Sequence, residues 1–383
     1  MKILTVVGAR PQFIKCKMVS QEICNDHEEI LVHTGQHYDW CLSKQYFEEL
    51  QIRAPDINLE VGAGSPVWQT GQILLRMEEV LRQNSPDMVL VYGDTTSTLA
   101  GALAAAKHNI PVAHVESGMR NYDKSMPEEQ NRVLTDHISD LLFAPCESAV
   151  VSLRRERIVD NVYNTGDVMV DAMHEHLGLA RKESMYKDFM HNQFTLATIH
   201  RAENTDDPAK LKAIIDAFLE IGDVMFSMHP RTKKRLEFYG LYNDFYERSS
   251  EKDEGVAIVN PVGYLDMLAL EYNAKRIITD SGGVQKEAYV LGVPCITIRD
   301  STEWVDTIKY GWNKLVPPET KAIVDAVRTF NPIQSKLIKG EFISMMRTLG
   351  GESTEIRPHF MGNGGASKKI ASILTEWSED RRL

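Results

Sequence analysis

The chain alternates short β-branched runs with longer amphipathic or Ala-rich segments, and this alternation occurs twice along its length. Such alternation is typical of parallel βαβ units. In the first half the predicted strands are Ile3–Val7, Glu29–His33, Met88–Tyr92, Val112–Val115 and Leu141–Ala144. After a polar stretch near residues 179–192 the pattern restarts, and the predicted strands are Phe194–Ile199, Asp223–Met228, Val256–Val259, Arg276–Thr279 and Pro294–Ile298.

We therefore predict an α/β protein with two Rossmann-like, doubly wound parallel-sheet domains that face each other across a cleft. The length of 383 residues agrees with this, because a domain typically holds about 150 residues. We place the first domain at residues 1–178 and the second at 179–362. The amphipathic stretch Ala366–Trp377 predicts a last helix within residues 363–383, which could pack on either domain.

The composition argues against several functional classes. The chain has 43 Lys and Arg against 54 Asp and Glu, a net charge of −11, whereas general nucleic-acid binding usually needs a basic face. No apolar run reaches the about 18 residues that span a bilayer, and the opening apolar stretch is too short for a signal peptide. The five cysteines form no CxxC pair and are typical of reduced thiols. We expect a cytoplasmic protein without a nucleic-acid or membrane partner.

The patterns of common metal and cofactor sites are also missing from the sequence. His174-Glu175-His176 places two histidines at i and i+2, where they point apart on a helix. We find no H-E-x-x-H, P-loop or G-x-G-x-x-G pattern. We therefore expect no metal and no cofactor.

Ligands of open parallel sheets bind at the carboxyl ends of the strands, so polar residues there are the first candidates for a site. The turn after the first strand brings Arg10 and Lys15, which could contact a phosphate or could be solvated residues at a helix start. Asp94 follows a later strand and is either a cleft carboxylate or the N-cap of the helix predicted at Thr95–His108.

Two glutamates of the first half allow different interpretations. Glu116 ends a buried strand, where an ionisable side chain is costly unless it is paired or used, so it is the better catalytic candidate. Glu128 matches a capping box with Ser125 and lies four residues before Arg132, so a cap or a surface ion pair could explain it.

The strongest single signal of the second half is the segment Thr279–Glu287. Ser281 is expected to cap a helix that Gly282 and Gly283 open, and the free N–H groups and dipole of a helix start bind anions. Glu287 lies further along the same helix, within reach of a ligand's sugar hydroxyls. His200 follows another strand and can titrate near neutrality, although a hydrogen-bonded structural role is also open.

Taken in order, these segments resemble the non-hydrolysing UDP-N-acetylglucosamine 2-epimerases. The resemblance extends from Lys2 to about Asp306. The matched pieces are Gly8–Lys15, Thr34-Gly35-Gln36-His37, Tyr92–Ser97, His114–Arg120, Met126–Arg132, His200–Asn204, Asn260-Pro261, Asp280–Glu287 and Arg299-Asp300-Ser301-Thr302-Glu303. It implies the fold of the GT-B glycosyltransferases, with a UDP-sugar between two domains and the last helix crossing back to the first.

The resemblance also implies an activity and a set of roles. The activity is inversion at C2 of the sugar, interconverting UDP-GlcNAc and UDP-ManNAc by elimination and re-addition of UDP, for cell-surface polysaccharide precursors, in a homodimer without a nicotinamide cofactor. The implied catalytic residues are Asp94, Glu116, Glu128 and His200. The implied substrate-binding residues are Arg10, Lys15, Gln36, Arg132, Arg201, Asn260, Ser281, Gly282, Gly283, Glu287 and Arg299.

The sequence departs from the common family pattern after Arg299. It has Ser301-Thr302-Glu303-Trp304-Val305-Asp306 where many members have Thr-Glu-Arg-Pro-Glu, and Trp-Val occurs in a branch that includes epimerases of UDP-2,3-diacetamido-glucuronic acid. The sugar's substituents therefore stay open. A GT-B glycosyltransferase, which would transfer the sugar to an acceptor, is the other alternative.

Overall fold

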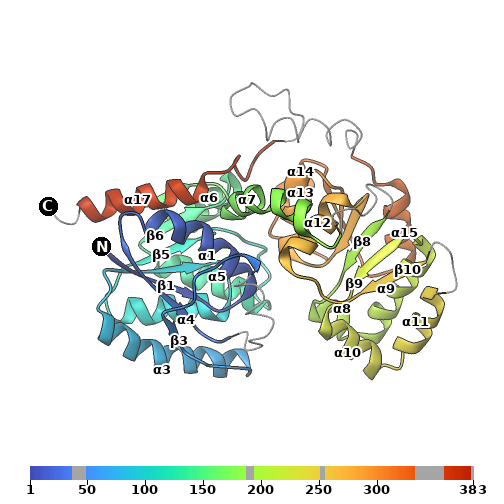
Figure 1. Cartoon of the computed structure of the whole chain (residues 1–383), viewed down its shortest axis with the longest axis horizontal. Coiled ribbons are helices and arrows are strands. Elements are labelled where there is room, and N and C mark those ends of the chain that lie inside the picture. Colours follow the sequence, from blue (N-terminus) through green and yellow to red (C-terminus); the bar gives the residue numbers. More distant parts are fainter. Residues whose placement is uncertain (37–48, 187–193, 251–254, 333–357, 381–383) are drawn as a thin grey trace. The chain divides into compact units, whose positions relative to one another are not determined.

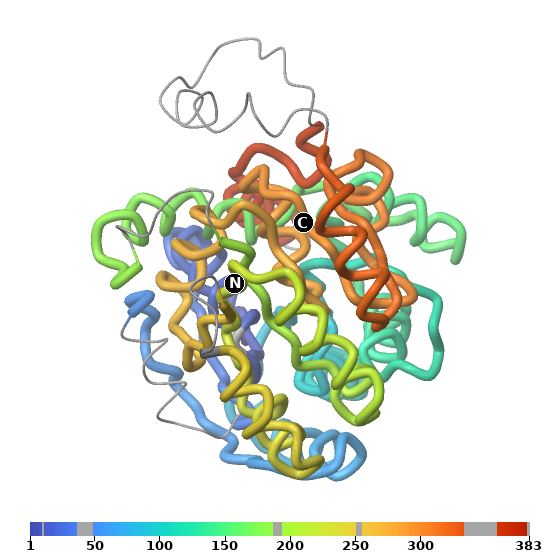
Figure 2. The backbone as a smooth tube through the Cα atoms, turned by 90° about the vertical axis from the view of Figure 1, so that its right-hand side faces the viewer, coloured from blue at the N-terminus to red at the C-terminus, as the bar shows by residue number. Residues whose placement is uncertain are grey.

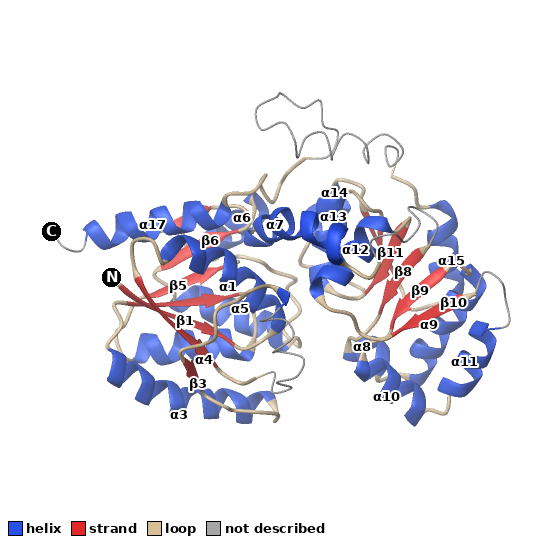
Figure 3. Ribbon diagram, in the orientation of Figure 1, coloured by secondary structure: helices blue, strands red, loops and turns tan. Residues whose placement is uncertain are grey.

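The structure is a computed structural model that describes residues 1–36, 49–186, 194–250, 255–332 and 358–380; the rest is drawn in grey in Figures 1 and 2. The chain divides into two compact units, Met1–Glu175 with His359–Leu383 and His176–Pro358. Each contains a parallel sheet with helices on both faces (Figure 3). The predicted α/β class with two doubly wound sheets is therefore confirmed.

The sheet of the first unit has the strand order β3-β2-β1-β4-β5-β6-β7. Its strands are β1 (Lys2–Val7), β2 (Glu28–His33), β3 (Ile57–Asn58), β4 (Met88–Tyr92), β5 (Val112–Val115), β6 (Leu141–Ala144) and β7 (Val162–Asn164). Its helices are α1 (Arg10–Ile23), α3 (Pro66–Asn84), α4 (Thr96–Lys107), α5 (Pro127–Ile138), α6 (Glu147–Arg155) and α7 (Val168–Glu183), the last of which continues into the second unit. The strand order reverses between β1 and β4, which puts the loops after these strands at the topological switch point.

The local sequence explains why these elements form. Every residue of β4 is buried, as expected for a strand covered by helices on both faces. Helix α4 is rich in alanine and packs closely on β1, where a Cβ at Gly101 would lie 3.1 Å from Val6. Pro127 occupies the first turn of α5, as predicted, because its missing N–H has no partner to lose there.

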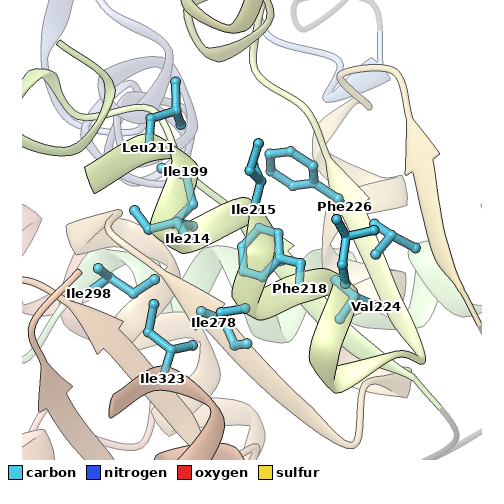
Figure 4. Close-up of a cluster of buried hydrophobic side chains, with 14 of the residues drawn as sticks. Ile199, Leu211, Ile214, Ile215, Phe218, Val224, Phe226, Ile278, Ile298 and Ile323 are labelled. Carbon is cyan, nitrogen blue, oxygen red and sulfur yellow. The ribbon is translucent and has the colours of Figure 1, made fainter. Parts of the chain in front are cut away.

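The sheet of the second unit has the order β10-β9-β8-β11-β12-β13 and reverses between β8 and β11. Its strands are β8 (Thr195–Thr198), β9 (Val224–Ser227), β10 (Val256–Val259), β11 (Arg276–Thr279), β12 (Cys295–Ile298) and β13 (Asn313–Val316). Its helices are α8 (Ala202–Thr205), α9 (Pro208–Ile221), α10 (Pro230–Phe238), α11 (Tyr242–Ser250), α12 (Tyr264–Asn273), α13 (Gly282–Leu291), α14 (Val305–Lys309) and α15 (Thr320–Thr329). A buried apolar cluster between α9, α15 and the sheet forms its core (Figure 4).

All the predicted strands are present, and their ends differ from the prediction by no more than one residue. The strands that the prediction missed are β3, β7 and β13, which lie at sheet edges. They are short, and only partly buried, so they lack the apolar run that marks a central strand.

The last helix, α17 (Ala366–Asp380), packs against α1 in the first unit (Figure 1). Asp171 of α7 accepts hydrogen bonds from the backbone N–H groups of Ala366 and Ser367 at 3.2 and 2.8 Å, which holds the start of the helix. The ring of His27 lies 3.0 Å from the Thr375 hydroxyl near its other end. None of the helices in the described part of the chain is long and apolar enough to cross a membrane.

Candidate active site

An ion pair between Lys15 and Glu116 lies at the carboxyl ends of β1 and β5. Lys15 projects from α1, its ammonium group bonds the Glu116 carboxylate, and both side chains are largely buried. Glu116 has a φ of +72°, which residues other than glycine rarely adopt, and its N–H donates to the Phe143 carbonyl at 3.0 Å. Backbone strain of this kind clusters at functional sites, so the geometry favours a chemical role for Glu116.

A second ion pair joins Asp94, after β4, to Arg132 of α5. The Arg132 Nη2 and Asp94 Oδ2 atoms are 2.5 Å apart, and the buried guanidinium also reaches Glu129 at 2.9 Å. Of the two interpretations that the sequence left open for Asp94, the structure does not support the N-cap of α4. Thr95 is the N-cap residue, and its hydroxyl accepts from the Thr98 N–H at 3.2 Å. The Asp94 carboxylate is therefore free of a capping role and is oriented by Arg132.

The capping box predicted for Ser125 and Glu128 does not form. Met126 is the N-cap residue of α5 and makes no side-chain cap bond, while the Ser125 hydroxyl donates to Asp123 at 2.7 Å. Glu128 is partly exposed, and among the described residues none bonds to its carboxylate. The structural explanation that the sequence allowed for Glu128 therefore loses its main support.

The neighbouring carboxylate, Glu129, has the structural role instead. It is buried and accepts hydrogen bonds from the backbone N–H groups of Asn121 and Tyr122 at 3.0 and 2.9 Å, in addition to its contact with Arg132. Glu129 thus holds the loop before α5 in place. Sequence reasoning missed this role, and the adjacent pair Glu128-Glu129 offered no local signal to separate the two.

A buried network beneath these carboxylates was also missed. His114 of β5 lies 2.7 Å from Asp136 of α5 and 2.8 Å from the carbonyl oxygen of Gly93. Asp136 also accepts from the Gly118 N–H at 3.0 Å and from Arg120 at 2.7 Å. Burial opposes ionisation of Asp136, but His114 and Arg120 outweigh it and lower the pKa of this carboxyl. The network connects α5 to the loops that carry Asp94 and Glu116.

Gln36, after β2, and Gly8, after β1, both pack against Ser97 at the start of α4. The Gln36 side chain accepts from the N–H and the hydroxyl of Ser97 at 3.1 and 2.6 Å. A Cβ at Gly8 would collide with the same Ser97 side chain, so only glycine fits there. Arg10 is the first residue of α1, and its side chain lies outside what the structure describes, as does His37.

In the second unit Asp280 organises the loop that carries His200. This fully buried carboxylate accepts from the backbone N–H groups of His200 and Arg201 at 3.0 and 2.9 Å, and from Asn204 at 3.0 Å. Burial lowers the pKa of His200, and the negative charge of Asp280 partly offsets this. Asp280 directly follows β11, and this strand-end position was the signal that could have identified it.

The start of α13 is the predicted anion site. Ser281 is its N-cap residue, but the predicted side-chain cap bond is absent, so no side-chain cap occupies the first N–H groups of the helix. A Cβ at Gly282 would overlap a carboxylate oxygen of Glu303, so any other residue at this position needs the Glu303 side chain to move. Arg299 pairs with Glu303 at 2.9 Å, and Arg201 lies 4.0 Å from it.

The remaining predicted residues of this unit are Gly283, Glu287 and Asn260. Gly283 is the second residue of α13, and a Cβ there would make an ordinary contact with the Ser281 hydroxyl oxygen at 3.9 Å. Glu287 lies on the same helix and is buried. Asn260 follows β10 and is exposed, and none of the site residues described above bonds to it.

Comparison with known proteins identifies the family. Residues 21–375 match the model of the UDP-N-acetylglucosamine 2-epimerase family. The chain belongs to this family. It is similar to a UDP-N-acetylglucosamine 2-epimerase homolog of Methanococcus maripaludis, at 47% identity with 98% of this chain and 99% of that one covered. The UDP-N-acetylglucosamine 2-epimerase of Methanocaldococcus jannaschii is 44% identical, over 98% and 99% of the two chains.

The chain is also similar to a relative that is named for a different nucleotide sugar. The UDP-2,3-diacetamido-2,3-dideoxy-D-glucuronate 2-epimerase of Pseudomonas aeruginosa is 41% identical over 98% of this chain and 100% of that one. Among solved structures, the M. jannaschii UDP-GlcNAc 2-epimerase in complex with UDP-GlcNAc and UDP matches with a TM-score of 0.85 and 40% identity, covering 98% and 100% of the two chains. The predicted enzyme class is confirmed: this epimerase is an isomerase that acts on a UDP-sugar.

Proposed function

We propose that this epimerase interconverts UDP-GlcNAc and UDP-ManNAc without hydrolysis, by eliminating and re-adding UDP. The observation that supports this most is the division of chemistry between the two units. The first has carboxylates at its strand ends, Glu116 and Asp94, each paired with a cation. It has a further carboxylate, Glu128, in the first turn of α5, with no bond to any described residue. The second offers an uncapped helix start next to His200 and Arg201.

The carboxylates of the first unit are suited to proton transfer at C2. The ion pair with Lys15 favours the ionised form of Glu116, which is the form that accepts a proton. Glu128 is the acid/base partner, because it is partly exposed and no described residue bonds to it. Asp94, oriented by Arg132, positions the sugar or tunes the other two carboxylates.

The second unit is suited to binding the diphosphate that leaves and returns. The N–H groups and the dipole of the α13 start favour anions, and Gly282 and Gly283 let phosphate oxygens approach the backbone. Because burial lowers the pKa of His200, its ring is mostly neutral in the free protein at pH 7 and takes up a proton when a diphosphate binds beside it. Glu287 accepts from the ribose hydroxyls.

The proposed reaction needs no external electron acceptor. A carboxylate takes the C2 proton, the C2–H electrons form the C1–C2 double bond, and the C1–O bond breaks with its electron pair on the β-phosphate oxygen. The products are UDP and a 2-acetamidoglucal. In the return step a carboxylic acid delivers a proton to the opposite face of C2, and the UDP oxygen forms the bond to C1 again.

A second substrate, UDP-2,3-diacetamido-glucuronic acid, is favoured by one observation. The departing segment after Arg299 packs on α13: Trp304 is buried, and the ammonium of Lys286 on that helix lies 4.6 Å from the centroid of its ring. The relative named for that substrate is 41% identical to this chain, slightly less than the M. jannaschii UDP-N-acetylglucosamine 2-epimerase at 44% and more than that of Bacillus subtilis at 30%. We therefore rank it second.

Incubation with each nucleotide sugar alone tests the function. With UDP-GlcNAc, we expect nuclear magnetic resonance spectra to show UDP-ManNAc growing to a constant ratio, without stoichiometric free sugar. Turnover of only the diacetamido-glucuronate would assign the second substrate. Release of free ManNAc with UDP would contradict the non-hydrolysing reaction, and turnover only with a sugar acceptor would indicate a glycosyltransferase.

We also propose a cytoplasmic homodimer that supplies precursors of cell-surface polysaccharides. This proposal is supported by the resemblance of the sequence to the non-hydrolysing epimerases. Sedimentation at micromolar concentration checks the dimer, and a monomer that is fully active would contradict it.

A further inference from the structure

Strand β5 contains a histidine whose two ring nitrogens both face hydrogen-bond acceptors. His114 is fully buried, its Nδ1 lies 2.7 Å from Oδ1 of Asp136, and its Nε2 lies 2.8 Å from the carbonyl oxygen of Gly93. A carbonyl oxygen accepts hydrogen bonds and cannot donate them, so Nε2 carries a hydrogen. The ring therefore donates to Gly93, a contact that the proposed mechanism does not use.

The Asp136 carboxylate is an acceptor on both of its oxygens. Its Oδ2 accepts from the Gly118 N–H at 3.0 Å and from Arg120 at 2.7 Å, and a guanidinium keeps its charge in a protein. Burial opposes ionisation, but the contacts with His114 and Arg120 outweigh it and hold the pKa of Asp136 below its ordinary value. Since an ionised carboxylate has no hydrogen to give, the hydrogen between Asp136 and His114 lies on Nδ1. The ring thus donates from both nitrogens.

The charges of this network balance when the ring is an imidazolium. Arg120 pairs with Asp136 and also, through Nε and Nη2, with both carboxylate oxygens of Glu156 at 2.8 Å. His114 and Arg120 are then two cations opposite two carboxylates, and buried charges are tolerated when they are paired in this way. His137 lies 3.3 Å from Glu156 at the solvent-facing end of the network, where its side chain is half exposed.

The other elements that pack against β5 carry few titratable side chains. Tyr92 is the one such residue of β4 and β6, and burial raises its pKa, so it stays neutral. In α4 the one such residue is Lys107, which is the last residue of that helix. On α5, Arg132 is already paired with Asp94 and Glu129. The arrangement therefore leaves Asp136 as the counter-ion of the ring.

Gly93 is fixed on both sides of its α-carbon. Its N–H donates to the Val115 carbonyl at 2.9 Å, its carbonyl accepts from His114, and its φ is +62°. This carbonyl belongs to the planar peptide group that includes the nitrogen of Asp94, so the ring sets the plane from which Asp94 starts. The next carbonyl, that of Asp94, accepts from the Asn131 amide at 2.8 Å. Asp94 is thereby held at its backbone as well as at its carboxylate.

We propose that His114 is a positioning residue: a buried imidazolium, held by Asp136, that fixes the Gly93–Asp94 peptide so that the Asp94 carboxylate meets the sugar in one orientation. This rests on the proposed function, in which Asp94 acts on the sugar. A charged donor makes a shorter and stronger hydrogen bond than a neutral one, so the imidazolium restrains the peptide more firmly than a neutral ring would. His114 acts through Gly93 and Asp94.

Three variants test this role by steady-state kinetics with UDP-GlcNAc and by titration calorimetry with UDP. His114→Phe keeps a ring without a donor, so kcat should fall about tenfold or more, because a slightly misplaced catalytic group is costly, while UDP affinity stays within about threefold of wild type. His114→Gln keeps a side-chain N–H for Gly93 and should recover most of that loss. Glu156→Gln is the matched control: it weakens the same network beyond Arg120 and should lower the melting temperature while kcat is unchanged.

Nuclear magnetic resonance of protein with nitrogen-15-labelled histidine reports the state of the ring directly. At pH 7 both ring nitrogens of His114, assigned by the signals that His114→Gln lacks, should have the chemical shifts of protonated nitrogens. An unprotonated ring nitrogen would overturn the proposal, as would wild-type kcat in a folded His114→Phe protein or an equal loss of kcat in Glu156→Gln. If His114→Phe does not fold, the spectrum still decides. Failure of wild type to epimerise UDP-GlcNAc would instead refute the proposed function, because the spectrum does not depend on a substrate.

Discussion

At the scale of single residues, Glu128 and Glu129 are neighbours in sequence with opposite environments. Glu129 is buried and bonded to two backbone N–H groups and to Arg132. Glu128 is partly exposed, and within the described ranges no residue bonds to its carboxylate. Glu129, whose carboxylate is fully hydrogen-bonded, stabilises the fold, whereas the Glu128 carboxylate is available to a substrate.

The pair therefore provides a matched test. Glu128→Gln should lower turnover about 10²- to 10⁴-fold with UDP affinity within a few-fold of wild type, since a general acid or base acts mainly in the transition state. Glu129→Gln should instead lower the free energy of unfolding by about 1–3 kcal/mol, because it weakens buried hydrogen bonds. Steady-state kinetics and thermal denaturation check both. Normal turnover with a lowered melting temperature in Glu128→Gln would show that Glu128 is structural.

The buried carboxyl of Glu271 predicts a pH dependence of stability. Its pKa is raised in the folded state, so between its ordinary value and its folded value the unfolded chain binds fewer protons than the native protein. Stability therefore falls as pH rises, with a slope of about 1.4 kcal/mol per pH unit for one proton. Glu271→Gln should gain stability relative to wild type as the pH rises from about 5 through neutrality, measured by denaturant unfolding. A constant difference across this range would show that Glu271 is ionised in the fold.

At the scale of elements, the start of α13 combines an uncapped helix with two glycines. Gly282→Asp should weaken UDP binding at least tenfold, because the added carboxylate lies where the diphosphate is proposed to bind. Gly282→Ala is the matched control, since its Cβ meets the same Glu303 carboxylate without adding a charge. Wild-type UDP affinity in a folded Gly282→Asp protein would refute the anion site.

At the scale of the whole molecule, the proposed elimination predicts that the C2 hydrogen of the sugar exchanges with solvent. In deuterated water the epimerised product should carry deuterium at C2, because the proton is delivered from a carboxyl group that equilibrates with water. Slow variants such as His200→Ala should release UDP and a glycal, because return of the diphosphate is impaired. Mass spectrometry detects both. Complete retention of the original hydrogen would contradict elimination and indicate a transient oxidation at the sugar instead.

The sequence by itself determined the order and bounds of the central strands and the strand-end positions of Glu116, Asp94 and Ser281. These depend on local periodicity and on the rule that parallel strands gather their carboxyl ends at one edge. Short edge strands such as β3 lack that periodicity and were missed.

The tertiary structure decided which polar residues support the site and which are available to a substrate. In the fold Glu129 is buried and Glu128 is partly exposed. Thr95, and not Asp94, caps α4, and α17 packs on α1. The fold also buries the carboxyl of Glu271 within α12. Each of these outcomes depends on contacts between residues from different elements, and a carboxylate's burial and partners cannot be derived from its neighbours in sequence.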